Sequence, residues 1–159
     1  MPKSIVLLSF FLLSSLWSYS QEVELIEFNS LKARMDTTKE VVVYNFWATW
    51  CKPCVAELPY FEKINAKYEG KKVKIVLVNL DFNSKTETLV IPFVKRNKLK
   101  STVLQIIDTD PNEWINQVDS SWSGAIPATL ILRAGIKKFF VEKEMTYEEL
   151  EEIVARLAD

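Results

Sequence analysis

The sequence of 159 residues contains no histidine and only two cysteines. Without histidine the chain cannot build the Cys–His pair of a cysteine protease, whereas thiol–disulfide exchange needs no histidine. A closed zinc site is also disfavoured, because two cysteines would need two further ligands that the chain does not offer as Cys or His. Two cysteines alone can hold Cu(I), so a metal-binding module remains an alternative.

The sequence also lacks an excess of charge and any sign of division into parts. Lys and Arg number 20 and Asp and Glu number 21, and the formal net charge of −1 argues against nucleic acid as a general partner. There is no internal repeat, low-complexity tract or Pro/Gly/Ser-rich linker, and the length fits one domain. We therefore expect a single domain over residues 21–159.

The first 20 residues have the layout of a secretory signal peptide. A short basic head, Met1–Lys3, precedes an apolar run, Ile5–Leu13, that is broken only by Ser9. Small and polar residues follow, which favours cleavage after Ser20. The run is too short to span a bilayer comfortably, which takes roughly 20 residues, although an uncleaved anchor stays an alternative. The sequence thus predicts a periplasmic or otherwise extracytoplasmic protein that has lost residues 1–20.

The two cysteines, Cys51 and Cys54, lie where an apolar run ends and a helical pattern begins. Val41–Trp47 is nearly all β-branched or aromatic, which predicts a buried central strand, and a helix is expected from Lys52 to Glu69. A thiol in the first helical turn faces unpaired backbone N–H groups and the positive end of the helix dipole, which stabilise the reactive thiolate. Sulfurs at this spacing can also close on each other, so we predict a pair that cycles between dithiol and disulfide.

A purely structural disulfide is the alternative to a redox role. A domain of this size does not need a disulfide for stability. A bridge between positions three apart also removes little entropy from the unfolded chain, because the closed loop is short. The position of the pair therefore favours the redox role.

Strands and helices are expected to alternate along the rest of the chain. Strands are expected at Val23–Phe28, Val73–Leu80, Thr102–Ile107, Ala128–Leu132 and Ile136–Val141, and helices from Asn29 to about Met35, over Thr86–Asn97 with a disturbance at Pro92, and from Pro111. Thr146 and Glu149 form a capping box that opens the last helix. This alternation, closed by a hairpin and a helix, predicts an α/β fold whose mixed central sheet is flanked by helices.

Three short motifs lie at defined positions relative to the predicted strands and helices. The stretch Phe46–Cys54, with the sequence FWATWCKPC, follows a strand, Pro59 lies in the next helix, and Ala125–Pro127 stands just before a later strand. In these motifs the chain, over about residues 23–158, resembles thioredoxin-fold proteins, and more narrowly TlpA-like extracytoplasmic thiol-disulfide oxidoreductases. The resemblance implies a thioredoxin-like fold with a cis-proline at Pro127 that faces the cysteines.

Two departures from thioredoxin point to the TlpA-like branch. The stretch Asp81–Ile126 is longer than its counterpart in thioredoxin and predicts an extra helix and strand inserted before the cis-proline. Asn45 replaces the buried aspartate on the central strand of thioredoxin. TlpA-like reductases resemble this chain in having Asn at that place and a glutamate where Glu57 stands.

Within the pair, Cys51 is expected to be the attacking sulfur, more exposed and at the helix N-cap, and Cys54 the resolving one. Glu57 follows Cys54 by three residues on the same helical face. It is expected to relay the proton that Cys54 loses, and the alternative is an ordinary acidic residue near a helix N-terminus. No cofactor beyond the redox-active disulfide, and no metal, is expected.

Around the sulfurs, Trp50, Ile126 and Pro127 are expected to contact the substrate. A cis bond before Pro127 turns the backbone of Ile126 towards the sulfurs, where its N–H and C=O can pair with an extended polypeptide. The alternative is an ordinary trans proline at the start of a strand. Pro53 suits the first helical turn and stiffens it, and Lys52 either favours the thiolate or is simply a solvated lysine.

The resemblance implies a thiol-disulfide oxidoreductase that acts on cysteines of extracytoplasmic proteins. Ile126 before the proline resembles the reductive members, which favours a reductant. Oxidised apocytochrome c before haem attachment is the substrate that the resemblance suggests, with electrons from a membrane thiol-reductant relay. A thiol oxidase or isomerase and a non-catalytic adaptor with an inert disulfide stay open. Copper-delivery relatives of this fold use a wider cysteine spacing plus a histidine, and the chain lacks both.

Overall fold

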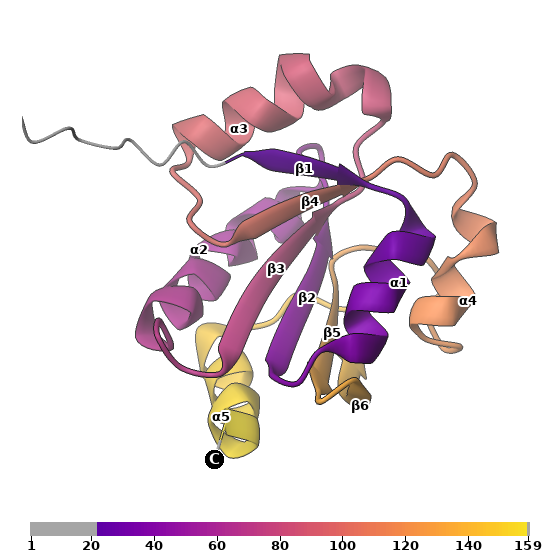
Figure 1. The fold of residues 1–159 in the computed structure, drawn as a ribbon. Coiled ribbons are helices and arrows are strands. Elements are labelled where there is room, and N and C mark those ends of the chain that lie inside the picture. Colours follow the sequence, from indigo (N-terminus) through magenta and orange to yellow (C-terminus); the bar gives the residue numbers. More distant parts are fainter. Residues whose placement is uncertain (1–21, 159) are drawn as a thin grey trace, which may run out of the picture.

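The computed structural model describes residues 22–158 (Figure 1). The predicted signal peptide, residues 1–20, lies outside the described residues. Among residues 22–158, no helix combines the length and the apolar character that crossing a bilayer requires.

A six-stranded mixed sheet forms the centre of the molecule, in the order β1-β4-β3-β2-β5-β6. The first four strands in that order are parallel to one another, and β5 and β6 run antiparallel to their neighbours. The strands are β1 (Val23–Ile26), β2 (Val41–Trp47), β3 (Val73–Asn79), β4 (Thr102–Ile106), β5 (Ala128–Arg133) and β6 (Ile136–Val141). The predicted strands are therefore all present, two with the predicted ends and four with one end that differs by one or two residues.

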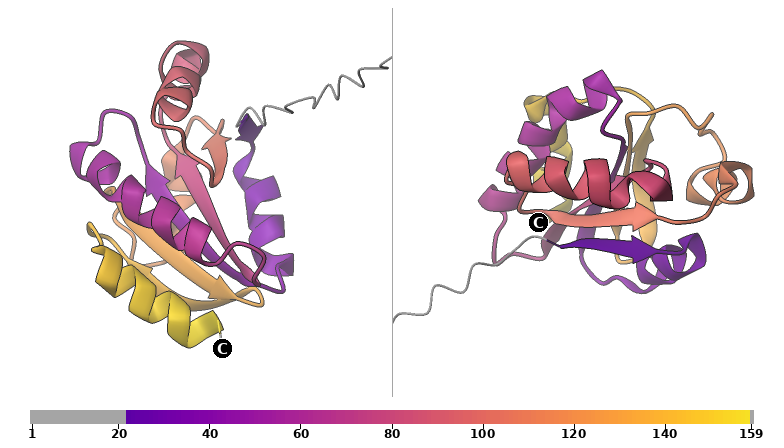
Figure 2. Two further views of the ribbon diagram at one scale, coloured as in Figure 1. Left: turned by 90° about the vertical axis from the view of Figure 1, so that its left-hand side faces the viewer. Right: turned by 90° about the horizontal axis from the view of Figure 1, so that it is seen from above.

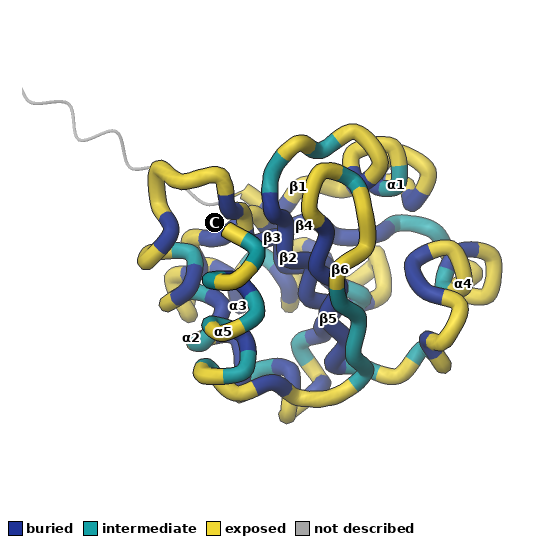
Figure 3. The backbone as a smooth tube through the Cα atoms, turned by 90° about the horizontal axis from the view of Figure 1, so that it is seen from below, coloured by how far each residue is buried: buried dark blue, intermediate teal, exposed yellow. Residues whose placement is uncertain are grey.

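Helices cover both faces of this sheet (Figures 1 and 2). One face carries α1 (Phe28–Thr37) and α4 (Ile115–Val118), and the other carries α2 (Lys52–Lys67), α3 (Ile91–Arg96) and α5 (Tyr147–Ala158). Because β2 lies between the two layers, all seven of its residues are buried, as predicted. In Figure 3 the central strands are accordingly dark blue, while the outer turns of the helices are exposed.

The inserted stretch before the cis-proline contains the predicted extra helix and strand. These are α3 and β4, and β4 enters the sheet between β1 and β3. The disturbance predicted at Pro92 takes the form of a π-helical turn, Thr86–Val90, in which the N–H of Ile91 donates to the carbonyl oxygen of Thr86. Since Pro92 has no N–H of its own, the helix changes its hydrogen-bond register there.

The start of α1 differs from the prediction. The helix begins at Phe28 and not after Asn29, and no side chain near its start caps it. The N–H of Phe28 instead donates to Asp108 Oδ2 at 2.6 Å, from a segment 80 residues away. A cap supplied by the tertiary fold leaves no local signal, which explains the error.

The hairpin between β5 and β6 turns through two residues with positive φ, Ala134 (51°) and Gly135 (73°). This is the geometry of a two-residue type I′ turn, whose twist matches that of the flanking strands. The turn packs against the end of α1, because a Cβ on Gly135 would lie 2.7 Å from the carbonyl oxygen of Asp36. The contact ties the hairpin to the helix layer.

Gly135 and Gly70 offer a matched test of this contact. Their φ values are 73° and 74°, so an alanine at either meets a similar backbone penalty of about 1–2 kcal/mol. No atom lies within 4 Å of a Cβ on Gly70. We expect Gly135→Ala to lower the free energy of unfolding by about 1 kcal/mol or more beyond the loss in Gly70→Ala. Urea denaturation measures both, and equal losses would show that the turn has room against α1.

Candidate functional site

The two cysteines lie at the start of α2, directly beyond the carboxyl end of β2. Cys51 is the N-cap residue of the helix, and its sulfur accepts from the N–H of Cys54 at 3.3 Å. The two sulfurs form a disulfide. Cys51 is 5% exposed and Cys54 is 0% exposed, so the sulfur at the helix start is the more accessible one. A partner can therefore reach the disulfide only from the side of Cys51.

The predicted cis-proline loop faces this sulfur. The Ile126–Pro127 peptide bond is cis, and the carbonyl oxygen of Ile126 lies 3.7 Å from Cys51 Sγ. A disulfide sulfur carries no hydrogen, so this is a contact and not a hydrogen bond. Among the described residues nothing accepts the N–H of Ile126. The backbone at Ile126 thus offers a free donor beside the sulfur of Cys51.

Aromatic side chains support the cis-proline loop from inside the molecule. Trp122 is buried and donates its indole N–H to the carbonyl oxygen of Ala125 at 2.8 Å. Its ring lies 4.7 Å from that of Phe46 and 5.8 Å from that of Trp114, measured between centroids. Trp122 is therefore a core residue that holds the loop in place. Trp47 likewise packs in the core, against Phe93.

Trp50 is the exposed aromatic of the site. It is 65% exposed, although it directly precedes a nearly buried cysteine. Trp50 and Ile126 both line a cavity of about 440 Å³, together with residues of the inserted stretch such as Phe82 and Ile115. Phe82 is 80% exposed. The sulfur of Cys51 thus adjoins an apolar surface that water contacts in the free protein.

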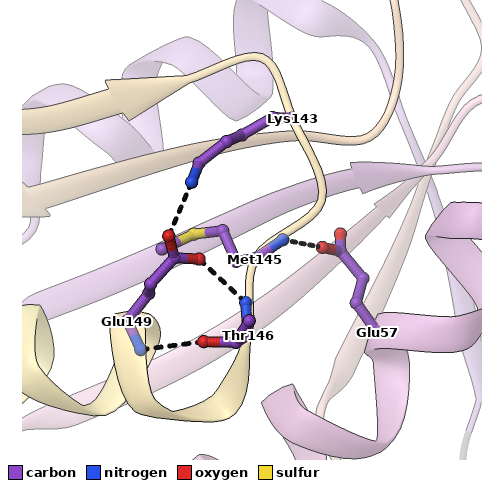
Figure 4. Close-up of polar contacts among 5 residues, drawn as sticks. All are labelled: Glu57, Lys143, Met145, Thr146 and Glu149. Atoms are coloured by element: carbon purple, nitrogen blue, oxygen red, sulfur yellow. Dashed lines mark hydrogen bonds and ion pairs between the residues drawn. The ribbon is translucent and has the colours of Figure 1, made fainter.

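Glu57 lies fully buried on α2, one turn after Cys54. Asn45 Nδ2 donates to one carboxyl oxygen at 2.7 Å. The N–H of Met145 donates to the other at 2.7 Å, and Figure 4 shows this second contact. Burial raises the pKa of Glu57 to about 7. The two hydrogen bonds lower the pKa, and the charge of nearby Glu144 raises it, but burial is the largest of these effects. The carboxyl is therefore poised to gain or lose a proton near neutral pH.

Figure 4 shows that Met145 lies between two sets of contacts, one with Glu57 and one that the neighbouring residues form with Glu149. The next residue, Thr146, forms the predicted capping box with Glu149: Thr146 N–H donates to the Glu149 carboxylate at 3.0 Å, and Glu149 N–H donates to Thr146 Oγ1 at 3.2 Å. Lys143 forms an ion pair with Glu149. The start of α5 is thus connected to the buried carboxyl group beneath the cysteines.

The two residues between the cysteines, Lys52 and Pro53, are exposed in the first turn of α2. Pro53 occupies a helical position where no intrahelical N–H donor is needed. Lys52 forms no ion pair with any other described residue. Lys52 is therefore a solvent-exposed cation that follows Cys51 in the chain.

Thr49 and Asp81 belong to the surroundings of the site but were not among the predicted residues. The Asp81 carboxylate accepts from the N–H and the hydroxyl of Thr49, at 2.7 and 2.6 Å. The available signal was that Asp81 directly follows a buried parallel strand, at the sheet edge where Cys51 also lies. Met145 gave no such signal, because it contributes only its backbone N–H.

Among residues 22–158, no group of three or more Cys, Asp or Glu side chains is arranged to hold a metal ion. The site therefore combines four features: the more exposed sulfur of a disulfide, a second sulfur behind it, a free backbone donor, and a buried carboxyl group with a pKa near neutrality. Such an arrangement can form a mixed disulfide with an extended polypeptide and move the proton that resolution requires.

The pKa of Glu57 makes stability depend on pH. Folded Glu57 keeps its proton up to about pH 7, while in the unfolded chain it loses it near pH 4.5. Because the folded state binds more protons in this window, the free energy of unfolding should fall, by at most about 3 kcal/mol, as pH rises from 4.5 to 7, and then level off.

The matched variant is Glu57→Gln, in which this decline should vanish. Gln can keep both contacts if the amide of Asn45 turns over, since Asn45 Oδ1 has no donor among the described residues. The carboxyl groups with lowered pKa values, such as those of Glu24 and Asp119, act below this window. Urea denaturation of the oxidised proteins from pH 4.5 to 8 measures the effect, and parallel profiles for the two proteins would contradict it.

Comparison with known proteins places the chain among redox proteins. The profile of the Redoxin family matches residues 25–129. The thiol-disulfide oxidoreductase ResA of Oceanobacillus iheyensis is 35% identical over 112 residues, which cover 69% of this chain and 53% of that protein. The chain thus spans about half the length of this curated relative.

Two solved structures share the fold. StoA from Bacillus subtilis is 30% identical, with a TM-score of 0.57 over 72% of this chain and 82% of that one. A secreted disulfide oxidoreductase of Mycobacterium tuberculosis, described as homologous to DsbE of E. coli, is 26% identical, with a TM-score of 0.57 over 76% and 84%. The thioredoxin-like fold is thereby confirmed, and the chain belongs to the Redoxin family.

Proposed function

We propose that this protein is a thiol-disulfide oxidoreductase that works through the Cys51–Cys54 pair. The observation that carries the proposal is the position of Cys51 Sγ, at the start of a helix and 3.7 Å from the backbone of the cis-proline loop. A polypeptide that pairs with the free N–H of Ile126 brings its own sulfur to Cys51. The names of the curated relative and of the related solved structure support the same activity.

In the reducing direction, the reaction runs in two exchanges. The Cys51 thiolate attacks a partner disulfide, which forms a mixed disulfide and releases one partner thiolate. The Cys54 thiol then loses its proton and attacks Cys51 Sγ, which closes the Cys51–Cys54 disulfide and releases the second partner thiolate. Two electrons pass from the protein to the partner, and the partner thiolates take up two protons.

Glu57 is the proposed acceptor of the proton from Cys54. Cys54 is fully buried, so its proton needs a nearby base, and Glu57 lies one helical turn away in the same buried region. A carboxyl with a pKa of about 7 can take up this proton in one step and release it later near neutral pH. Asn45 and Met145 hold the carboxyl in position by donating to it.

The substrates we propose are disulfides of extracytoplasmic proteins, with oxidised apocytochrome c as one candidate. Trp50, Ile126 and Pro127 would form the contact surface, and the apolar cavity beside them suits a non-polar side chain next to the partner cysteine. A membrane thiol-reductant relay would return the electrons. The leader-like residues 1–20 and the secreted relative of Mycobacterium tuberculosis support an extracytoplasmic location.

The central test is a trap for the mixed disulfide. Cys54→Ser leaves Cys51 able to attack but removes the resolving sulfur, so the variant should accumulate a covalent complex with a disulfide-containing protein such as oxidised insulin. Cys51→Ser is the matched control and should trap at least about tenfold less, because its remaining sulfur is fully buried. Non-reducing electrophoresis detects the complexes. Equal trapping by both variants would refute the roles assigned to the two cysteines. A wild-type protein that reduces no disulfide would instead favour a non-catalytic adaptor with an inert disulfide.

The proton transfer by Glu57 has a kinetic signature. The rate of resolution in the wild-type protein should rise with pH through a step near pH 7, as Glu57 becomes able to accept the proton. Glu57→Gln should lose this step and slow resolution by about tenfold to a hundredfold at pH 7. Stopped-flow tryptophan fluorescence across pH 5.5–9 follows the reaction. A step near pH 7 that persists in the variant would assign it to another group.

A further inference from the structure

Asp81 is a buried carboxylate that the mechanism above does not use. It lies directly beyond β3 and Leu80 and is 4% exposed. Three donors reach its two oxygens: the N–H of Thr49, the hydroxyl of Thr49, and Asn79 Nδ2 at 2.8 Å. Its backbone is fixed as well, since its N–H donates to Asn79 Oδ1 and its carbonyl oxygen accepts from Gln105 Nε2. The carboxylate therefore has one well-defined position.

All the groups that bind this carboxylate are neutral. An amide N–H and the Asn79 amide nitrogen can only donate, which is the pattern of partners that an ionised carboxylate collects. No Lys or Arg among residues 22–158 forms an ion pair with Asp81. Asp81 thus places a negative charge in the protein interior without a cation against it, and such a charge acts over a longer distance than one in water.

This charge lies beside the active-site loop. Thr49, which carries two of the hydrogen bonds, is two residues before Cys51, so the carboxylate lies within about 10 Å of the Cys51 backbone. Asp81 also lines the same cavity as Trp50 and Ile126, and the carbonyl oxygen of Ile126 touches Cys51 Sγ. The negative charge is therefore close to the place where the thiolate develops.

The other charged groups near Cys51 are few. Lys52 on its own helix is exposed to solvent, and Glu57 lies buried on the same helix on the Cys54 side. Asp108 lines the cavity and caps α1. The cis-proline loop contributes no charged residue, since Gly124 to Pro127 are all uncharged. Asp81 is thus the buried charge that is tied directly to the loop before Cys51.

We propose that Asp81 lowers the reduction potential of the Cys51–Cys54 pair and so favours its action as a reductant. The helix N-terminus stabilises the Cys51 thiolate, and the Asp81 charge opposes this stabilisation. Because only the reduced state carries a thiolate, Asp81 destabilises the reduced state relative to the disulfide and makes the pair a better electron donor. Asp81 acts on Cys51 through its charge and through the loop at Thr49, and it forms no hydrogen bond with the sulfur. The inference rests on the proposed thiol–disulfide exchange and explains its direction.

The test is a neutral replacement of the same shape. In Asp81→Asn, the side-chain oxygen can keep the bonds from Thr49 N–H and Asn79, and the new amide can donate to the Thr49 hydroxyl, which then accepts. The pKa of Cys51 should fall by about one pH unit. At pH 8.5 the equilibrium with reduced and oxidised glutathione should shift severalfold, up to about tenfold, towards the dithiol.

Thr49→Val is the matched control for loop geometry. It removes the hydroxyl contact, keeps the Asp81 charge, and should not lower the pKa of Cys51. Thiolate absorbance at 240 nm gives the pKa, and thiol alkylation of glutathione-equilibrated samples gives the equilibrium constant. Asp81→Ser serves as a second neutral variant if Asp81→Asn does not fold, which thermal unfolding reports.

The outcomes separate this inference from the proposed function. The inference is supported if the pKa of Cys51 falls and the glutathione equilibrium shifts in the neutral Asp81 variants but not in Thr49→Val. Unchanged values, or the same change in Thr49→Val, overturn it while the wild-type pair still exchanges with glutathione. A wild-type disulfide that does not exchange with glutathione at all would instead overturn the proposed function. Wild-type exchange with a strongly oxidising equilibrium would overturn the reducing direction.

Discussion

The burial of β2 on both faces is the constraint on which the rest of the molecule depends. All seven residues of Val41–Trp47 are buried, and Ala48 after them is buried as well, so the strand ends inside the core at the carboxyl edge of the sheet. The parallel neighbour β3 ends at the same edge, and Leu80 N–H donates to the carbonyl oxygen of Trp47 at 2.8 Å. This edge is where Cys51 begins α2 and where Asp81 meets the loop. The site is thus positioned by the shared edge at which these two parallel strands end.

Two buried carboxyl groups lie near the disulfide, and their partners give them different behaviour. Glu57 has two hydrogen bonds, and burial outweighs them, so its pKa lies at about 7 and its proton is exchangeable. The Asp81 carboxylate collects three donors on its side chain. The same functional group is therefore placed in two different settings, one dominated by burial at Glu57 and one rich in hydrogen-bond donors at Asp81.

Much of this was visible in the sequence because it depends on local patterns. The apolar run before Cys51, the Thr146 capping box and the Pro92 disturbance each lie within a few residues, and each is present in the structure. What could not be predicted depends on contacts between distant segments. Asp108 caps α1 across 80 residues, and Met145 reaches Glu57 across 88. A backbone N–H has no residue type, so no sequence pattern announces such a contact.

The inserted stretch contributes more than a longer connection. It adds β4 to the sheet, supplies walls of the cavity beside Trp50, and through Gln105 holds the backbone of Asp81. A cysteine motif alone fixes which bond is exchanged but leaves the potential open, because the potential follows the stability of the thiolate. An insertion that shapes both the contact surface and the charge near Cys51 can therefore change partner and direction together while the cysteines stay as they are.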